Sequence, residues 1–184
     1  MNNSNRILVT GAKGFVGSYL LKTWLDKEMN VIGTSREDTD LSKDMLTCRA
    51  VDTIVHTAAL CPNKRHKVEQ YVDNNVTATR NLCEYAQDFG IDKFIYLSTM
   101  SVYDSEPYGV TKLMGELILG DYDFESVIVR LPRVYADGTV TLRSPLTFSP
   151  LVLSQRVYEP TRNEGIGFGY MYLREVEQFL WSLL

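Results

Sequence analysis

Residues 6–17 read RILVTGAKGFVG, an apolar run followed by three closely spaced glycines. The run Arg6–Thr10 has the length and the β-branched content of a buried strand. The segment Phe15–Lys27 then carries apolar residues on one helical face, namely Val16, Tyr19, Leu20 and Trp24. A strand joined to a helix by a short glycine-rich turn is typical of a parallel sheet, in which helices connect successive strands. This stretch alone therefore predicts an α/β fold.

The alternation of strand-like and helix-like segments continues over most of the chain. We expect further strands at Asn30–Ser35, Asp52–Ala58, Lys93–Ser98 and Ser126–Leu131. We expect further helices at Val68–Asp88 and Pro107–Leu119, and a last one in the closing segment YLREVEQFLWSLL. This order predicts a Rossmann-like, doubly wound parallel sheet with helices on its faces.

The pattern weakens from Ala136, where Pro, Ser, Thr and Gly interrupt the apolar spacing. We expect irregular structure there, with one short strand or helix before the closing helix. The chain is therefore divided into a main domain over residues 1–135 and a reduced C-terminal part over residues 136–184 that packs on it.

Composition excludes several function classes. The chain has 184 residues, of which 45% are hydrophobic and 23% charged, as expected for one globular core. A formal net charge of −4 provides no overall attraction to nucleic acid or to an anionic membrane surface. No signal-peptide pattern or long apolar run is present, so we expect a cytoplasmic protein. The three cysteines and two histidines lack metal-ligand spacing, so we expect free thiols and no metal site.

The glycine-rich turn predicts a dinucleotide site. Gly11 permits a tight turn, Gly14 lets a pyrophosphate approach the backbone, and Gly17 lets the helix pack on the strand. Phe15 and Val16 open the helix, whose unpaired N–H groups can bind phosphate. Glycines that serve only the turn geometry are the structural alternative, which the flanking strand and helix disfavour.

The end of the second predicted strand bears on which dinucleotide binds. A site for NAD usually places a carboxylate there, whereas this chain has Ser35 and Arg36. A hydroxyl and a guanidinium suit a 2′-phosphate, so we expect NADP. Glu37 and Asp38 follow directly, and they keep NAD open as the alternative.

Eight motifs follow one another in a recognisable order: TGAKGFVG, TDLS, VHTAA, NNVTATRNL, LSTMSVY, YGVTK, VRLPRVY and YLREVEQFLWSLL. This series resembles the extended short-chain dehydrogenase/reductase family, which includes nucleotide-sugar epimerases, dehydratases and reductases. The resemblance is continuous from about Arg6 to Tyr135 and resumes weakly over the closing helix. It implies an NAD(P)-binding domain in residues 1–135 and a substrate-binding role for residues 136–184.

The resemblance also implies roles for individual positions. The expected cofactor contacts are Gly11, Gly14, Phe15, Val16, Gly17, Ser35, Arg36, Asp40, Leu41, Ala58, Ala59, Tyr108, Lys112, Leu131 and Pro132. Expected substrate contacts are Thr99, Ser101 and Arg133, and the expected catalytic set is Thr99, Tyr108 and Lys112. Asn75 is expected on the long helix behind the active site.

Hydride transfer at a sugar carbonyl requires proton transfer at its oxygen. A free tyrosine, with a pKa near 10, is a poor base at neutral pH. A spacing of four on a helix brings Lys112 to the same face as Tyr108, where its charge favours the phenolate. Thr99, at the end of a strand, is expected to orient the carbonyl oxygen.

The motifs leave two reaction classes open. Family dehydratases carry Asp-Glu after the Thr, whereas Met100 and Ser101 stand here, which argues against dehydration. We expect reduction of a 4-keto sugar on a nucleotide, with 4-epimerisation as the alternative. A silent NADP-binding sensor or partner subunit is the alternative from another class, because the stretch before Tyr108 and the C-terminal part are both shorter than in the family. Helices 68–88 and 107–119 resemble those that pair into a family homodimer.

Overall fold

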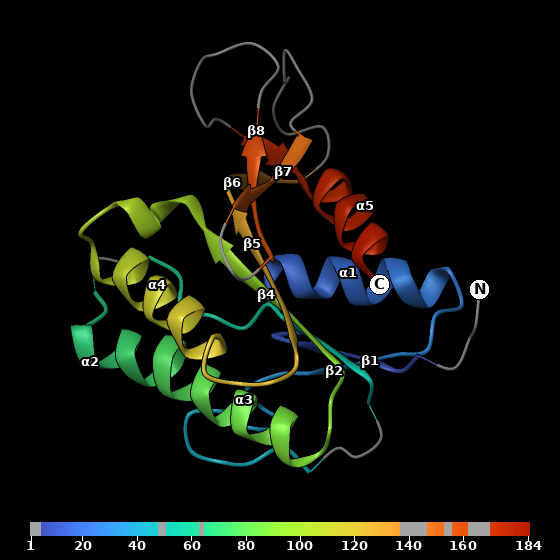
Figure 1. The fold of residues 1–184 in the computed structure, drawn as a ribbon, viewed down its shortest axis with the longest axis horizontal. Helices are drawn as coiled ribbons and strands as arrows, with labels where there is room; N and C mark the ends of the chain where they lie inside the picture. The colour runs from blue at the N-terminus through green and yellow to red at the C-terminus, as the bar shows by residue number, and fades with distance from the viewer. Residues whose placement is uncertain (1–4, 48–50, 63–64, 137–146, 153–155, 162–169) are drawn as a thin grey trace.

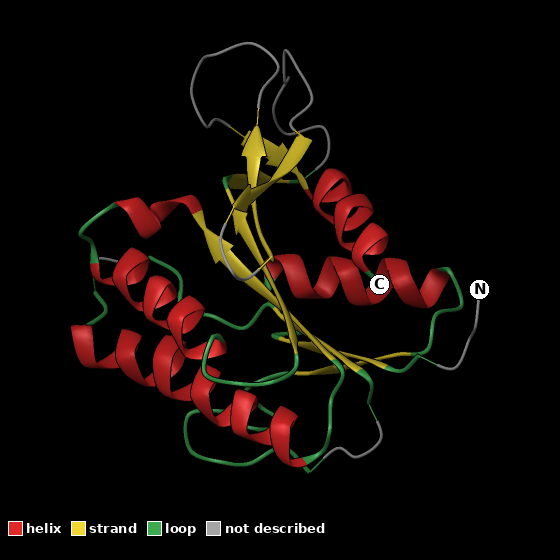
Figure 2. Ribbon diagram, viewed as in Figure 1, coloured by secondary structure: helices red, strands yellow, loops and turns green. Residues whose placement is uncertain are grey.

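The computed structural model describes residues 5–47, 51–62, 65–136, 147–152, 156–161 and 170–184. Helices cover both faces of one sheet and give three layers (Figures 1 and 2). The helices of one face are α1 (Phe15–Asp26) and α5 (Leu173–Leu183). Those of the other face are α2 (Val68–Tyr71), α3 (Ala78–Asp88) and α4 (Pro107–Leu119). None of these described helices combines the length and apolar character that crossing a bilayer requires.

The sheet has the order β2-β1-β3-β4-β5-β8-β7. Its strands are β1 (Ile7–Thr10), β2 (Val31–Thr34), β3 (Thr53–His56), β4 (Lys93–Thr99), β5 (Glu125–Leu131), β7 (Thr147–Val152) and β8 (Arg156–Thr161). All neighbours pair in parallel except β7 with β8. The predicted doubly wound parallel sheet is therefore confirmed. The chain places β2 on one side of β1 and then continues with β3, β4 and β5 on the other side.

The five predicted strands are present, with ends shifted by one or two residues. The largest change is in the predicted strand Asp52–Ala58, which ends at His56. The Thr57 hydroxyl donates a hydrogen bond to the Thr10 carbonyl at 2.6 Å, and the Ala58 N–H donates to the Thr10 hydroxyl at 3.4 Å. These bonds turn the chain over the end of β1 and take it out of the sheet.

The core forms one cluster on each face of the sheet. On the α3 and α4 face, Leu8, Ile54, Phe94 and Tyr96 pack with helix residues such as Leu82. On the α1 and α5 face, alternate strand residues meet Leu20, Trp24, Val176 and Leu180. Successive strand residues point to opposite faces, so both faces of a parallel sheet can be apolar, as the continuous apolar runs indicated.

The predicted helix Val68–Asp88 is helical throughout but not uniform. Between α2 and α3 the chain forms the π-helical segment η1 (Val72–Thr77). The wider turn holds Asn75, whose side chain leaves the helix surface for the interior and is 1% exposed. Short π-helical segments occur frequently at functional sites.

The C-terminal part differs from the prediction of irregular structure with one short element. It contains β7 and β8, which extend the main sheet beyond β5, and β9 (Tyr170–Tyr172), which pairs with β6 (Arg133–Tyr135). Helix α5 then packs against α1, as expected for the closing helix. There the buried Glu177 carboxylate accepts hydrogen bonds from Trp24 Nε1 at 2.9 Å and Lys27 Nζ at 2.8 Å.

Candidate active site

The parallel sheet collects the predicted site segments at one edge. Register pairs Thr10 with both Thr34 and His56, and it pairs Thr99 with Leu131. Because these strands are parallel, the segments that follow them leave from the same edge of the sheet. The glycine-rich turn, the β2 exit, the Ala58–Ala59 loop, Thr99 and Pro132 therefore lie on one side of the molecule.

The glycine-rich turn has the shape that phosphate binding requires. Gly11 has a φ of +68°, and a Cβ there would lie 2.8 Å from the Ala58 backbone. A Cβ at Gly17 would lie 2.3 Å from the Gly11 carbonyl oxygen, so α1 can approach the turn only with glycine at that position. Helix α1 begins after Gly14 without a side-chain cap, which leaves the N–H groups of its first turn, including those of Phe15 and Val16, without partners inside the helix. These residues fit the pyrophosphate of a dinucleotide.

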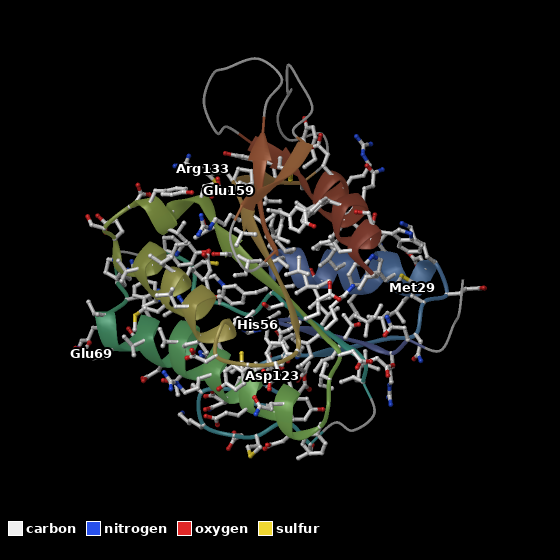
Figure 3. The ribbon with its side chains drawn as sticks, viewed as in Figure 1. Met29, His56, Glu69, Asp123, Arg133 and Glu159 are labelled. Carbon is white, nitrogen blue, oxygen red and sulfur yellow. The ribbon has the colours of Figure 1, made fainter. Side chains whose placement is uncertain are left out.

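His56 links the end of β1 to α3 through a chain of hydrogen bonds that the sequence did not predict. The Thr79 hydroxyl donates to the Asn75 carbonyl at 2.7 Å, so it accepts from His56 Nε2 at 3.2 Å. His56 Nδ1 is then unprotonated and accepts from the Thr10 hydroxyl at 2.7 Å. Burial, aided by the nearby Lys112 charge, lowers the pKa of His56 to about 3. The neutral imidazole in the middle of the molecule (Figure 3) thus supports the turn and carries no charge.

Asn75 joins the loop after β3 to α4, the helix that carries Tyr108 and Lys112. Its side-chain oxygen accepts from the Leu60 N–H at 2.7 Å, and its amide nitrogen donates to the Leu60 carbonyl at 3.3 Å and to the Thr111 hydroxyl at 3.1 Å. Thr111 immediately precedes Lys112 in α4. Asn75 therefore lies behind the site, as the family resemblance implied.

At the end of β2, the Ser35 hydroxyl is already engaged. Both the Ser35 N–H, at 2.9 Å, and its hydroxyl, at 2.6 Å, donate to the Asp38 carboxylate, which lowers the pKa of Asp38. Glu37 pairs with Lys13 of the glycine-rich turn, and Arg36 is exposed. Two carboxylates thus flank the position expected to hold a 2′-phosphate.

Among the expected cofactor contacts, the family resemblance places Asp40 and Leu41 at the adenine, and both residues have local structural partners. The Asp40 carboxylate accepts from the Ser42 hydroxyl at 2.7 Å, and this bond lowers the pKa of Asp40. Leu41 is buried in the core, and its carbonyl accepts from the Asn81 amide at 2.8 Å. Their predicted adenine contacts stay a prediction.

The structure brings Thr99 and Tyr108 together. Tyr108 lies in the first turn of α4, close enough to Thr99 at the end of β4 for the Thr99 hydroxyl to affect the pKa of Tyr108. The short connection is closed by Gly109, where a Cβ would lie 1.9 Å from the Ser101 carbonyl oxygen. Ser101 itself donates its N–H to the Thr99 hydroxyl at 3.2 Å. Without a side chain at position 109, α4 packs directly on the turn that follows Thr99.

The pKa of Tyr108 differs from the expectation that the charge of Lys112 would lower it. Burial raises the pKa of Tyr108, with the nearby Cys61 adding to the effect and the Thr99 hydroxyl opposing it. Burial also lowers the pKa of Lys112 to about 7. The Lys112 ammonium lies over the Tyr96 ring, 3.9 Å from its centroid. Cys61, expected only as a free thiol, therefore lies close enough to influence both catalytic candidates.

A buried ionic cluster beside Thr99 was also missed from the sequence. Glu116, one turn after Lys112, accepts from the Ser98 hydroxyl and from Arg130 at 2.6 Å. The same guanidinium donates to Glu159 of β8 at 2.6 Å and to the Tyr103 hydroxyl at 2.8 Å. This cluster ties α4, β5 and β8 together immediately behind the Thr99 end of the sheet.

The remaining predicted residues lie at the same edge of the sheet. Ala58 and Ala59 are half-buried in the loop after β3. Leu131 is buried at the end of β5, Pro132 is half-buried, and the exposed Arg133 begins β6 (Figure 3). Ser101 is half-buried beside Thr99. Their cofactor and substrate contacts stay predictions.

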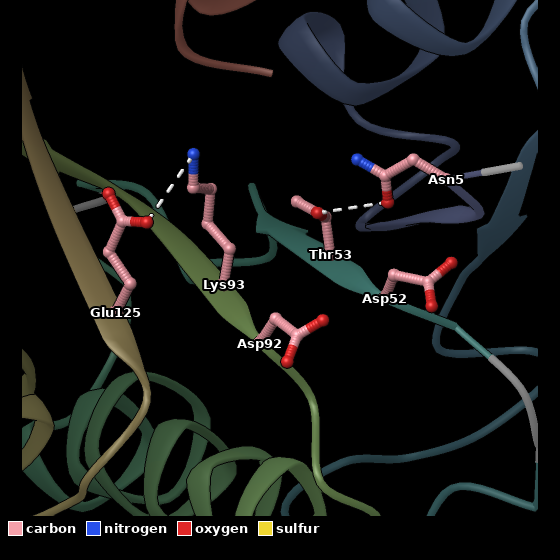
Figure 4. A pocket seen from close by; sticks show the side chains of 6 residues that line it. All are labelled: Asn5, Asp52, Thr53, Asp92, Lys93 and Glu125. Carbon is pink, nitrogen blue, oxygen red and sulfur yellow. Dashed lines mark hydrogen bonds and ion pairs between the residues drawn. The ribbon is translucent and has the colours of Figure 1, made fainter. Parts of the chain in front are cut away.

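An open hollow lies at the opposite edge of the sheet (Figure 4). Its lining residues are Asn5, Asp52, Thr53, Asp92, Lys93 and Glu125, from the starts of β3, β4 and β5. Lys93 pairs with Glu125 at 3.6 Å, and Thr53 donates to Asn5 at 3.3 Å. Because the strands end at the other edge, this hollow is separate from the candidate active site.

Comparison with known proteins identifies the family. The sequence profile of the NAD dependent epimerase/dehydratase family matches residues 7–158, most of the chain. The chain belongs to this family. The match covers the glycine-rich turn, Thr99, Tyr108 and Lys112 in one continuous stretch.

Among named relatives, an uncharacterised UDP-glucose epimerase of Bacillus subtilis is 31% identical over 88% of this chain and 66% of its own length. A UDP-glucose 4-epimerase of Erwinia amylovora is 26% identical over 67% of this chain and 52% of its own length. The chain thus spans between about half and two thirds of these relatives.

Solved structures show the same relation. MoeE5 in complex with UDP-glucose and NAD superposes with a TM-score of 0.64 at 28% identity, over 74% of this chain and 57% of that one. A dTDP-4-dehydrorhamnose reductase of Clostridium acetobutylicum gives 0.64 at 25% identity, over 73% of this chain and 55% of that one. The family is therefore one of NAD-dependent nucleotide-sugar enzymes.

Proposed function

We propose that the chain binds NAD and exchanges a hydride at a ring carbon of a nucleotide-linked sugar. The observation that carries this proposal is the placement of Tyr108, in the first turn of α4, beside Thr99 at the end of β4, where Gly109 packs α4 on the turn after Thr99, at the sheet edge that also holds the glycine-rich turn. A protein that only sensed the dinucleotide would need the turn but neither of these hydroxyls. The neighbouring Lys112 belongs to the same set.

Each residue has a defined task in this proposal. Bound NAD supplies the hydride acceptor and donor, as well as a positive charge when it is oxidised. Tyr108 moves the proton at the sugar oxygen, and the Thr99 hydroxyl orients that oxygen. Lys112 provides positive charge beside the cofactor. The raised pKa of Tyr108 keeps its phenol protonated, ready to give a proton to a keto sugar. For oxidation of a sugar hydroxyl, the charges of Lys112 and oxidised NAD would have to lower that pKa so that Tyr108 can accept the proton.

We propose 4-epimerisation first, because the relatives at 31% and 26% identity are named as UDP-glucose epimerases. Reduction of a 4-keto sugar, the sequence prediction, is the second candidate. It is favoured by the protonated Tyr108 and by the likeness to a dTDP-4-dehydrorhamnose reductase.

One assay separates these functions. The protein is incubated with NAD and UDP-glucose or UDP-galactose, and separately with NADH and a dTDP-4-keto-6-deoxyhexose. Interconversion of the two UDP-sugars without net NADH change supports epimerisation, whereas NADH consumption with the keto sugar supports reduction. Tight NAD binding with no turnover in either arm would instead support the silent sensor.

For the cofactor, we propose NAD in place of the expected NADP. Asp38 occupies the Ser35 hydrogen bonds that a 2′-phosphate would need, and Glu37 adds a second negative charge. A dianionic phosphate is repelled at this position, whereas ribose hydroxyls can donate to a carboxylate. The structure of MoeE5, which is similar to this chain, contains NAD.

Asp38→Asn is expected to shift the cofactor preference. We expect the wild-type protein to bind NAD more tightly than NADP, and the variant to reduce this ratio of affinities about tenfold. Titration of both dinucleotides by calorimetry measures the ratio. Asp44→Asn, at an exposed position farther along the loop, is the matched control and should leave it unchanged. If the wild type binds NADP more tightly than NAD, the result would instead support NADP, the cofactor expected from the sequence.

We further propose a homodimer through helices 68–88 and 107–119. Val110, Met114 and Leu117 form an exposed stripe along α4 at helical spacing, with Leu117 68% exposed. Val68 and Val72, on the adjoining α2 and η1, extend it. An apolar stripe of this kind is typical of a surface that is covered by a partner.

Leu117→Glu is expected to convert this dimer to monomer, because it places a charge in the centre of the proposed contact. Light scattering after size exclusion measures the molar mass. Leu25→Glu, on the exposed side of α1 across the sheet, introduces the same change outside the interface and should remain dimeric. A monomeric wild type at micromolar concentration would exclude the interface.

A further inference from the structure

The Lys112 side chain is held in an unusual environment. Both Lys112 and Tyr96 are at most 1% exposed, and the Lys112 Nζ atom lies 3.9 Å from the centroid of the Tyr96 ring. The Tyr96 hydroxyl also donates to the Lys112 carbonyl at 3.4 Å. One tyrosine of β4 thus contacts both ends of this residue.

Glu116, the nearest carboxylate along α4, does not pair with Lys112 in place of the Tyr96 ring. Glu116 is engaged by Arg130 and by the Ser98 hydroxyl. In the parts of the chain that the structure describes, Lys112 forms no ion pair. The negative face of an aromatic ring attracts a cation most strongly where water is excluded, so the ring is the closest favourable partner of this ammonium.

The sequence builds this contact from several positions. Tyr96 fits beneath α4 because Gly115 has no side chain, and a Cβ there would lie 2.2 Å from the Tyr96 hydroxyl oxygen. On its other side Tyr96 meets the His56 ring, at a centroid distance of 5.6 Å. The neutral state of that imidazole avoids repulsion with Lys112.

We propose that Tyr96 is a positioning residue whose aromatic face fixes the Lys112 ammonium at the active site and stabilises its charged form. The task of Lys112 in turnover rests on the proposed function, but the way in which it is held does not. The groups that act on its charge are Cys61 in the loop after β3 and Glu116 on α4, while His56 on β3 faces it as a neutral imidazole. Burial lowers the pKa of Lys112 to about 7, while Cys61 and Glu116 oppose that change. Near neutral pH the ring therefore influences how much of the lysine is charged.

The test is an NMR titration of lysine labelled with ¹³C at its ε-carbon, with Lys112→Met used to assign the signal. Tyr96→Phe keeps the ring and should move the Lys112 pKa by less than about half a unit. Tyr96→Leu removes the ring and should lower that pKa by about one unit or more. Phe94→Leu is the matched control. Phe94 is equally buried on the same face of β4, and this substitution removes an aromatic ring that lies away from Lys112.

A second series tests the proposal without a change of shape. Trifluorophenylalanine at position 96 weakens the negative ring face, and it should lower the Lys112 pKa relative to phenylalanine at the same position. This arm decides the matter if Tyr96→Leu does not fold. An unchanged or raised pKa in the fluorinated protein, or an equal fall in Phe94→Leu, overturns the proposal. The titration requires no substrate, so its outcome does not depend on whether the proposed enzymatic function is correct.

Discussion

Tyr108→Phe is expected to lower the turnover rate by about 10²–10⁴-fold while leaving NAD affinity within about twofold. The variant retains the ring at the start of α4, but it loses the hydroxyl that lies beside Thr99. Proton transfer at the sugar oxygen then has no side chain in place, whereas the glycine-rich turn is untouched. The measurement is the initial rate on the substrate found in the screen, combined with calorimetric titration of NAD.

Tyr122→Phe is the matched control for this change. Tyr122 is a partly buried tyrosine after α4 that stacks on Phe124, with 5.6 Å between ring centroids, away from the sheet edge that bears Thr99. It should retain full turnover. A Tyr108→Phe protein that keeps the wild-type rate would remove Tyr108 from the acid–base role and would leave Thr99 and Cys61 as the groups to examine next.

The first five strands could be predicted because each is a short apolar run with a turn at its ends, and such runs in βα order specify a parallel sheet. The C-terminal strands could not be predicted in this way. β8 forms because it pairs with the free edge of β5, with Val157 opposite Ile128, and β7 pairs with it in turn. Strands that depend on distant partners, and that contain residues such as Pro150 and Pro160, show no clear period in the sequence.

The site could be predicted as a set of positions but not as a set of contacts. The motif spacing placed Thr99, Tyr108 and Lys112 at one edge, and in the structure Thr99 lies close enough to Tyr108 to affect its pKa. The partner of Lys112 is Tyr96, sixteen positions earlier on another element, which no local spacing reveals. The engagement of Ser35 by Asp38 was likewise open in the sequence, because a neighbouring carboxylate can turn toward the hydroxyl or toward solvent.

Lys112→Met is expected to stabilise the protein at mildly acidic pH, by roughly 3–5 kcal/mol at about pH 6. The buried ammonium has its pKa lowered from 10.5 to about 7, so folding at that pH must place a charge in a dry interior. Methionine has a similar length and no charge, and it packs well in apolar surroundings. Urea unfolding of the two proteins measures the difference in the free energy of unfolding.

The sign of the pH dependence follows from the proton count. Between about pH 7 and pH 10.5 the unfolded state holds the Lys112 proton and the folded state does not, so wild-type stability rises with pH in that window. The advantage of Lys112→Met should therefore be largest at about pH 6 and should shrink steadily by about pH 9.5. Lys22→Met, at an exposed position on α1, should show no such trend. A difference between wild type and Lys112→Met that stays constant with pH would mean that Lys112 keeps an ordinary lysine pKa in the folded protein, which its burial over the Tyr96 ring argues against.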